Sequence, residues 1–174
     1  MAQASSQDLF SSIGEQYEAA FGHDQGLLKF IVKVLEHLNP KSHILDVGCC
    51  TGKPVATTAA GAGHKITRID LSEVMVKLAW KAVPAGTFEI ADMLTYQPKD
   101  IKFDVVLNMF SLFLLRRDDV ELMATRWNSW LPLDGVLAIG TGAAEDVHPE
   151  KLGTNMTKMA LVLARCPSNS WGRP

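Results

Sequence analysis

The chain has 174 residues, of which 47% are hydrophobic and 21% charged, a composition typical of one globular domain with a substantial buried core. Its formal net charge is -2 and its basic residues form no cluster, which argues against a nucleic-acid partner. Three cysteines, two of them adjacent, make no disulfide framework, and no stretch is long and apolar enough to span a bilayer, so we expect a cytoplasmic protein without a membrane partner.

Strand and helix patterns alternate along the chain. Apolar residues at helical spacing predict a helix over residues 24–38, which Asn39 and Pro40 would end. Further helices are expected after Pro54, after Ser72 as an N-cap, and from the capping-box pair Asp118 and Glu121. Short apolar runs between them predict five strands, at residues 43–47, 64–70, 87–92, 102–110 and 136–140.

This alternation predicts an α/β domain with a parallel sheet. Right-handed crossovers would place the loops that follow the strands along one edge, where open sheets of this kind bind ligands. Four polar features fall at that edge, namely residues 46–52, Asp70, Asp92 and Asn108. The sequence therefore predicts a binding site there.

The stretch ILDVGCCTG, residues 44–52, predicts a loop that presents bare backbone to a ligand. Gly48 and Gly52 permit a tight turn, but the spacing is neither that of a dinucleotide fingerprint nor that of a P-loop. Asp70 lies where an acid accepts the two hydroxyls of a ribose, and Asp92 lies where a carboxylate could accept from an adenine amino group. These features predict an adenosine site without a phosphate site.

Taken in order, ILDVGCCTG, GHKITRIDLSEVMVKLA, FEIADM and FDVVLNMFSLFLL resemble the motifs of class I S-adenosylmethionine-dependent methyltransferases of the small-molecule, methyltransferase-domain type. The resemblance implies a Rossmann-like, doubly wound, mostly parallel sheet with helices on both faces. It divides the chain into a helical cap over the cofactor site at 1–40, a Rossmann-like core at 41–142, and a short C-terminal helix and tail at 143–174.

The resemblance also implies the cofactor S-adenosyl-L-methionine, with S-adenosyl-L-homocysteine as product. Its methionine tail would lie over residues 48–52, its ribose on Asp70 and its adenine beside Met75, Asp92 and Met93. The cofactor-binding residues that the resemblance implies are Tyr17, Asp46, Gly48, Cys49, Cys50, Gly52, Asp70, Leu71, Met75, Ala91, Asp92, Met93, Asn108, Met109 and Phe110.

Cys50 departs from the family, whose loop usually has glycine at this position. If the position needs a positive φ, a cysteine costs about 1–2 kcal/mol, and if φ is negative only a small side chain is added near the cofactor. A redox pair of Cys49 and Cys50 is the alternative, but adjacent cysteines do not bridge easily, so small apolar filler is the favoured interpretation.

The predicted function is a methyltransferase that acts on a small organic molecule of secondary metabolism, with His148 or His23 as candidate catalytic bases. The alternative is a methyltransferase-like protein without transfer activity, which serves as a partner subunit or regulator or catalyses a rearrangement in the inherited pocket. No metal is expected, because the histidines and cysteines lack ligand spacing.

The C-terminal segment is predicted to lack the strand pair that closes the sheet in this family. TNMTKMALVLARC, residues 154–166, is predicted to form one short helix, so the sheet would be truncated after the fifth strand and that strand would be an open edge. Three explanations stay open: the C-terminal helix covers the edge, a second copy covers it, or the sequence is a truncation. A homodimer is the favoured one.

Overall fold

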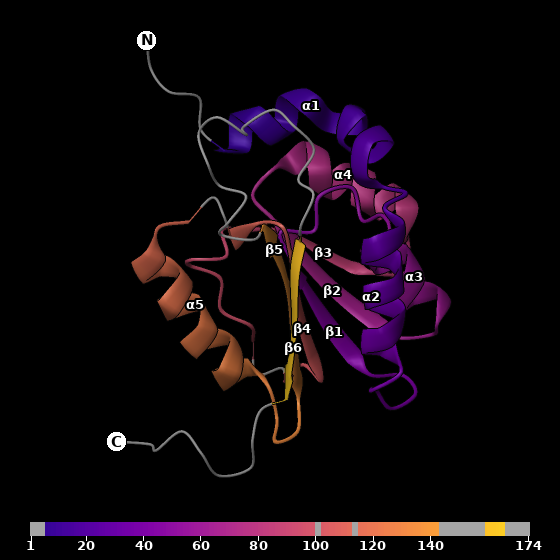
Figure 1. The fold of residues 1–174 in the computed structure, drawn as a ribbon. Helices are drawn as coiled ribbons and strands as arrows, with labels where there is room; N and C mark the ends of the chain where they lie inside the picture. Colours follow the sequence, from indigo (N-terminus) through magenta and orange to yellow (C-terminus); the bar gives the residue numbers. More distant parts are fainter. Residues whose placement is uncertain (1–5, 100–101, 113–114, 143–158, 166–174) are drawn as a thin grey trace.

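The computed structural model describes residues 6–99, 102–112, 115–142 and 159–165 (Figure 1). Helices and strands alternate through most of the chain after two initial helices. In chain order the elements are α1 Ser6–Phe21, α2 Gln25–Leu35, β1 His43–Val47, α3 Val55–Gly61, β2 Lys65–Asp70, α4 Glu73–Ala82, β3 Thr87–Ile90, β4 Val105–Met109, α5 Arg117–Trp130, β5 Val136–Gly142 and β6 Met159–Arg165. None of the helices in the described ranges is long and apolar enough to cross a membrane.

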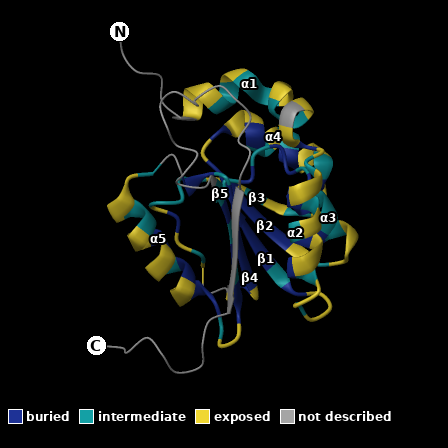
Figure 2. Ribbon diagram, in the orientation of Figure 1, coloured by how far each residue is buried: buried dark blue, intermediate teal, exposed yellow. Residues whose placement is uncertain are grey.

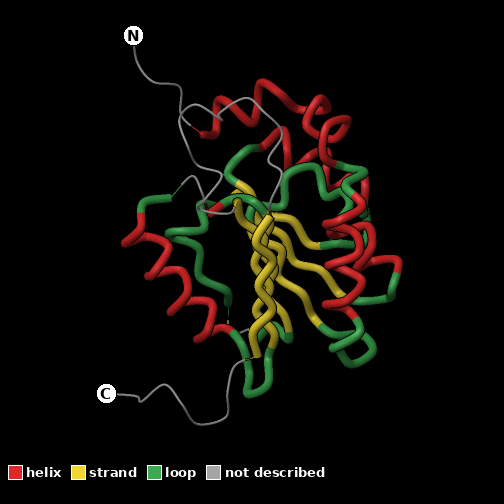
Figure 3. Tube along the Cα trace, viewed as in Figure 1, coloured by secondary structure: helices red, strands yellow, loops and turns green. Residues whose placement is uncertain are grey.

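The six strands form one twisted sheet in the order β3-β2-β1-β4-β5-β6 (Figure 3). Strands β1 to β5 are parallel, and β6 pairs antiparallel with β5. The prediction of a Rossmann-like, mostly parallel α/β fold is therefore confirmed. The strand order reverses between β1 and β4, and the carboxyl ends beside this reversal are where such sheets bind ligands.

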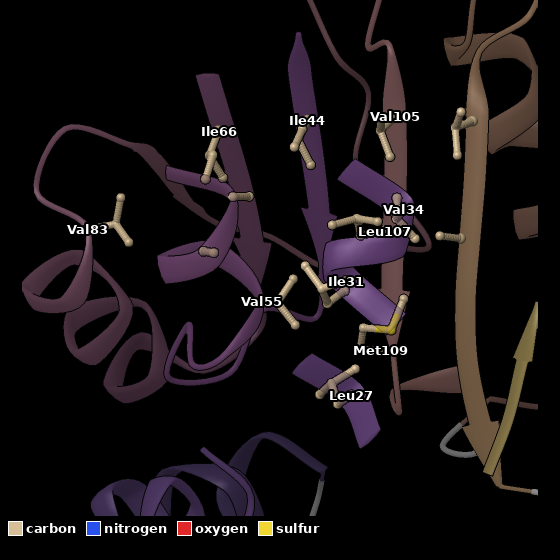
Figure 4. Packing of buried hydrophobic residues seen from close by; sticks show 14 residues of the cluster. Leu27, Ile31, Val34, Ile44, Val55, Ile66, Val83, Val105, Leu107 and Met109 are labelled. Carbon is tan, nitrogen blue, oxygen red and sulfur yellow. The ribbon is translucent and has the colours of Figure 1, made fainter. Parts of the chain in front are cut away.

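Helices cover both faces of the sheet, with α2 and α3 on one side and α5 on the other (Figure 1). Strands β1, β2 and β4 are almost entirely buried between these helices (Figure 2), which fits the apolar runs of β1 and β4. Ile31 and Val34 of α2 pack against Ile44 and Leu107 on one face (Figure 4). On the other face, the fully buried Trp127 of α5 packs in a second hydrophobic cluster with Leu45 and Val106 of the sheet, so both faces of the sheet carry a hydrophobic core.

Strand β6 corrects the expectation for the C-terminal segment. The predicted short helix over 154–166 is wrong within 159–165, which form a strand in register with β5 from Gly142 opposite Met159 to Val136 opposite Arg165. The sheet is therefore not truncated after the fifth strand, and the outer side of β5 is paired. A short apolar run fits either structure by periodicity, and here the unpaired main chain of β5 supplies the partner. The argument for a homodimer loses its basis, and the remainder of 143–174 lies outside the described residues.

One predicted helix cap is confirmed, at Ser72, a second is wrong, and α2 has a cap at Asp24 that was not predicted. Asp24 accepts from the Leu27 amide at 2.6 Å to begin α2, and Ser72 accepts from the Met75 amide at 3.3 Å to begin α4. The predicted capping box at α5 is wrong, because the helix begins at Arg117 after Arg116, whose side chain makes no cap hydrogen bond. The Glu121 carboxylate, which the capping box would turn back toward the start of the helix, instead pairs with the Arg117 side chain one turn away.

Helix α1 is broken at Gly14, whose φ of 40° and ψ of -119° are not helical. Two helical segments, 6–13 and 15–21, therefore meet at an angle above α4 (Figure 1). A β-carbon at Gly14 would lie 3.7 Å from Val74, so space alone does not demand glycine, but the backbone conformation favours it. Together the two segments cover the carboxyl edge of the sheet.

Candidate functional site

A cavity of about 170 Å³ lies at the carboxyl edge, among the segments that follow β1, β2, β3 and β4. Eight of the predicted cofactor-binding residues line it: Gly48, Cys50, Asp70, Leu71, Ala91, Asp92, Met93 and Phe110. Sequence reasoning missed the others, which are Gln7, Phe10, Ile69, Ser72, Leu94, Ser111 and Leu115. Each predicted position follows a strand end, whereas Gln7 and Phe10 come from α1, which no strand-end rule could place.

The loop after β1 depends on two glycines. Gly48 has a φ of 70° and Gly52 a φ of 86°, a region that side chains disfavour. A β-carbon at Gly48 would lie 2.8 Å from the Ser111 side chain, and one at Gly52 would lie 2.7 Å from Nη2 of Arg68. Both glycines are therefore required by backbone conformation and by close neighbours at once.

Cys50 also has a positive φ, of 44°, so the steric cost of about 1–2 kcal/mol expected for a side chain in this region applies. Its amide donates to Oδ2 of Asp70 at 2.8 Å, and its thiol lies close enough to the Tyr17 hydroxyl for the two groups to affect each other's pKa. Burial and the nearby Asp70 carboxylate raise the pKa of the Cys50 thiol to about 12. Burial likewise raises the pKa of Cys49, and neither cysteine is in a disulfide. Both side chains therefore fit the interpretation that they are small, uncharged packing groups better than that of a redox pair.

Asp70 is the central acid of the cavity. Its Oδ1 accepts from the Ser72 amide at 2.9 Å and its Oδ2 from the Cys50 amide. Burial raises the pKa of Asp70, while these two amides act in the opposite direction and favour the carboxylate. Asp92 also lines the cavity, and its Oδ1 accepts from the Leu94 amide at 2.8 Å. The two acids thus stand at neighbouring strand ends with their orientations fixed by backbone.

Asp46 does not line the cavity, in contrast to the direct role expected for it. It is buried behind the loop, where its Oδ2 accepts from Nη2 of Arg68 at 3.1 Å and from Nε at 3.3 Å. Arg68 also donates to the Cys49 carbonyl at 3.2 Å. Sequence reasoning missed Arg68, although an arginine between Ile66 and Ile69 in a buried strand was a visible signal.

Several other predicted residues support the site from behind instead of facing the cavity. Asn108 is fully buried and donates to the Val47 carbonyl at 3.1 Å and to the Ser111 hydroxyl. Met75, Met109 and the Cys49 side chain are buried, and Gly52 faces Arg68. These side chains fix the strand ends that carry the lining residues.

The two candidate bases are not brought to the cavity in the described part of the chain. His23 is exposed and lines a separate cavity beside Glu18 and Lys53. His148 lies outside the described residues. Among the described residues, no cluster of three or more histidine, cysteine or acidic side chains is arranged to hold a metal ion.

Helix α1 is attached to the rim of the cavity by polar side chains. Ser11 and Ser72 share a hydroxyl–hydroxyl hydrogen bond of 2.9 Å, and Lys53 pairs with Glu18 at 2.9 Å. Tyr17 adds its contact with Cys50, and burial raises the pKa of its hydroxyl far above the ordinary value. Tyr17, predicted to bind the cofactor, is not among the residues that line the cavity, and its contact with Cys50 places it beside the loop.

A cavity at the strand reversal, a positive-φ loop after β1 and an acid ending β2 define the class of S-adenosylmethionine-dependent methyltransferase folds. The family described as "Methyltransferase domain" matches residues 44–135, more than half of the chain, and the chain belongs to this family. The sequence resemblance to that class is thereby confirmed.

Known relatives agree with this assignment. Demethylmenaquinone methyltransferase from Thermotoga maritima is 30% identical over 108 residues, 59% of this chain and 47% of that protein, so the match spans about half of the curated relative. A TehB-like methyltransferase from Corynebacterium glutamicum has a TM-score of 0.62 and 24% identity, over 74% of this chain and 69% of that one. CalS10, an amino pentose methyltransferase from Micromonospora echinaspora, has a TM-score of 0.60 and 23% identity, over 71% and 55% respectively. At these identities the two structures show the shared fold.

Proposed function

We propose that this chain binds S-adenosylmethionine in the carboxyl-edge cavity and transfers its methyl group to a small organic molecule. The observation that carries the proposal is the Asp70 carboxylate, which ends β2, lines the cavity and is held by the amides of Cys50 and Ser72. A carboxylate at this place in a doubly wound sheet is the usual acceptor for a ribose. Membership in the methyltransferase-domain family supports the same reaction class.

The groups around the cavity fit an adenosyl ligand. Each Asp70 oxygen accepts one amide and keeps a lone pair for one hydroxyl of a ribose diol. Asp92 can accept from an adenine amino group, and the adjacent Met93 offers a polarisable wall to the ring. Gly48 brings bare backbone to the cavity beside Cys50, where the methionine portion would lie.

The size of the cavity indicates that α1 must move outward for the ligand to enter. Pockets for ligands of this size usually measure about 300–1,000 Å³, whereas this cavity measures about 170 Å³. Gln7 and Phe10 of the first α1 segment form part of its wall, and the helix is broken just beyond them at Gly14. We infer that the segment 6–13 is displaced on binding.

When bound, S-adenosylmethionine supplies a methyl group on a sulfonium, and its in-line displacement leaves a neutral thioether. The residues around the cavity contribute by orienting the ligand and excluding water from the reacting centre. Asp70 and Asp92 would fix the nucleoside end, while Phe110 and Ser111 after β4 would bound the methyl end. Because positioning supplies most of the catalysis, the reaction does not require a histidine among the lining residues.

The remaining wall points to a neutral acceptor of partly apolar character. Phe10, Leu94 and Leu115 are apolar, and Gln7 and Ser111 offer polar contacts without charge. Among the described lining residues the only charged side chains are the two aspartates, which would repel an anionic acceptor. We propose a hydroxyl, amine or other heteroatom of a neutral compound of secondary metabolism as the acceptor, as the biosynthetic role of CalS10 supports.

Titration calorimetry with S-adenosylmethionine and S-adenosylhomocysteine tests the binding step. We expect micromolar affinity for the wild type and a loss of about 100-fold in Asp70→Ala, since each hydrogen bond to a charged group contributes about 1.5–3 kcal/mol. Asp118→Ala is the matched control, because Asp118 is exposed in the first turn of α5. A folded wild type that binds neither compound would contradict the proposal.

A methyl-transfer screen tests the second step. The chain is incubated with S-adenosylmethionine labelled in its methyl group and with matched sets of neutral phenols, amines and carboxylic acids. We expect label in neutral acceptors and none in carboxylates. Binding without transfer to any acceptor would favour the alternative in which the domain serves as a partner subunit or regulator.

A further inference from the structure

Arg68 is an arginine whose side chain is completely buried in the centre of the domain. It occupies the middle of β2, directly opposite Asp46 in the register of β1 and β2. Charged side chains are almost never fully buried unless they are paired, because removing them from water is costly. The site described above needs an acid at Asp70 but gives no reason for an arginine two residues before it.

The guanidinium of Arg68 contacts the loop at three points. It bonds Asp46 before the loop through Nε and Nη2, and it donates from Nη2 to the Cys49 carbonyl within the loop. It also fills the space that a side chain at Gly52 would occupy. Its carbon lies 5.4 Å from the centre of the Phe88 ring, which fixes the plane of the group against β3.

Arg68 and Asp70 hold opposite sides of one peptide unit. The carbonyl of Cys49 accepts from Arg68, and the amide of the same peptide bond, which belongs to Cys50, donates to Asp70. Because a trans peptide is planar with its oxygen and hydrogen on opposite sides, these two contacts restrict its orientation, together with the Gly52 amide, which also donates to the Cys49 carbonyl at 2.9 Å. The orientation of this peptide helps set φ of Cys50, which lies in the disfavoured positive region.

We propose that Arg68 is the positioning residue of this loop: it holds the peptide between Cys49 and Cys50 so that a non-glycine residue keeps a positive φ and its amide stays on Asp70. The inference rests on the proposed function, because the oriented Asp70 is the group that would accept the ribose. Arg68 itself does not line the cavity, so it acts through the peptide and through Asp46.

The charge of Arg68 serves the same arrangement. Burial raises the pKa of Asp46, Arg68 acts to lower it, and the nearby Asp70 adds to the rise. With Arg68 in place, the negative charge of Asp46 is balanced, and Asp70 is the acid left to interact with a ligand. A lysine at this position would keep the charge but not the fork that reaches both Asp46 and the Cys49 carbonyl.

The proposal makes a specific prediction for Arg68→Lys in two backgrounds, wild type and Cys50→Gly. In the wild-type background we expect the affinity for S-adenosylhomocysteine to fall about tenfold, the effect of losing one charge-assisted hydrogen bond. In the Cys50→Gly background we expect a loss of about twofold or less, because glycine adopts the positive φ without being held. Arg117→Lys, on the exposed face of α5, is the control for the substitution itself.

Hydrogen exchange of the residue-50 amide, measured without ligand, gives an independent readout. We expect Arg68→Lys to speed exchange at residue 50 about tenfold relative to the wild type, with the amides of the β1–β2 pairing unchanged. Equal affinity losses in both backgrounds together with unchanged exchange at residue 50 would overturn the proposal and leave Arg68 a structural ion pair. Absence of ligand binding by the wild type would instead contradict the proposed function, and the exchange result would still decide the role of Arg68.

Discussion

The floor and the roof of the cavity are built in opposite ways. The floor consists of the end of β1, the loop 48–52 and β2, and its polar groups are buried and bonded to each other, as in the pair of Asp46 and Arg68. The roof is α1, a broken helix attached by a hydroxyl pair, a half-exposed ion pair and the contact of Tyr17 with Cys50.

This difference separates two tasks. Buried polar groups that hydrogen-bond one another restrict the geometry of the floor, which is what an acid that must meet a ribose requires. The ion pair of Lys53 with Glu18 is partly exposed and such pairs contribute only about 0–1 kcal/mol, so the polar contacts of the roof are weaker than those of the floor. The small volume of the cavity fits such an arrangement, in which the floor is preformed and the roof is displaced on binding.

The largest expected effect comes from placing a side chain into the floor. We expect Gly52→Ala to lower the free energy of unfolding by about 3 kcal/mol or more, because the added carbon meets the buried Arg68 guanidinium and φ is positive. Gly63→Ala is a matched control with nearly the same φ and no described atom within 4 Å of the added carbon, and it should lose only about 1 kcal/mol. Urea denaturation measures both; equal losses would show that the contact with Arg68 is unimportant.

Raising the pH is expected to have a smaller effect on stability, through the Cys50 thiol between the loop 48–52 and α1. The thiol of Cys50 has its pKa raised from 9.0 to about 12, so the folded state favours the protonated thiol. This contribution is present below pH 9 and is lost as pH rises toward 12, which amounts to about 1.4 kcal/mol between pH 8 and pH 10.

Thermal melts of the wild type and Cys50→Ala at pH 8 and pH 10 check this prediction. The wild type should lose more stability than the variant over that interval. Identical losses would indicate that the thiol ionises in the folded protein as it does in the unfolded chain.

The backbone strain at residue 50 is expected to contribute about 1 kcal/mol. Cys50→Gly and Cys50→Ala both remove the thiol and its contact with Tyr17, but only alanine retains a β-carbon at a φ of 44°. Cys50→Gly should therefore be the more stable of the two by that amount in urea denaturation. A more stable alanine variant would contradict the assignment of strain to this position.

The smallest expected change in stability comes from loosening the roof. We expect Ser11→Ala to change the free energy of unfolding by less than about 0.5 kcal/mol, because its hydroxyl bonds only Ser72 at a partly exposed site. The same variant should react faster with a thiol reagent at Cys50, measured in a Cys49→Ala, Cys166→Ser background. An unchanged labelling rate would show that Ser11 does not hold the segment 6–13 over the cavity.

The floor was largely predictable from the sequence because its signals are local. Glycines after an apolar strand, and acids after the next two strands, follow from how parallel strands end at one edge. Arg68 was not recognised, because its role depends on its position opposite Asp46 on the neighbouring strand and on its contact with the Cys49 carbonyl. The pattern of a single sequence does not specify which residues of two paired strands lie opposite each other.

The roof and the far edge of the sheet were less predictable for a different reason. Gln7 and Phe10 reach the cavity through the path of the α1 segment that precedes the break at Gly14, which spacing along the chain does not specify. The apolar run of β6 suits a helix or a strand, and only its pairing with β5 decides between them. At α5 the acids that match a capping box are displaced by two positions, because the N-cap is Arg116 and not Asp118.

Ser72 joins the two halves of the site in a single residue. Its amide holds Asp70, its hydroxyl caps α4, and the same hydroxyl bonds Ser11 of α1. A ligand that engages Asp70 therefore acts on a group whose partner also anchors the roof. Displacement of α1 and ligand affinity are then thermodynamically linked, so whatever factor the closed position of α1 takes from affinity, binding must take from the closed population.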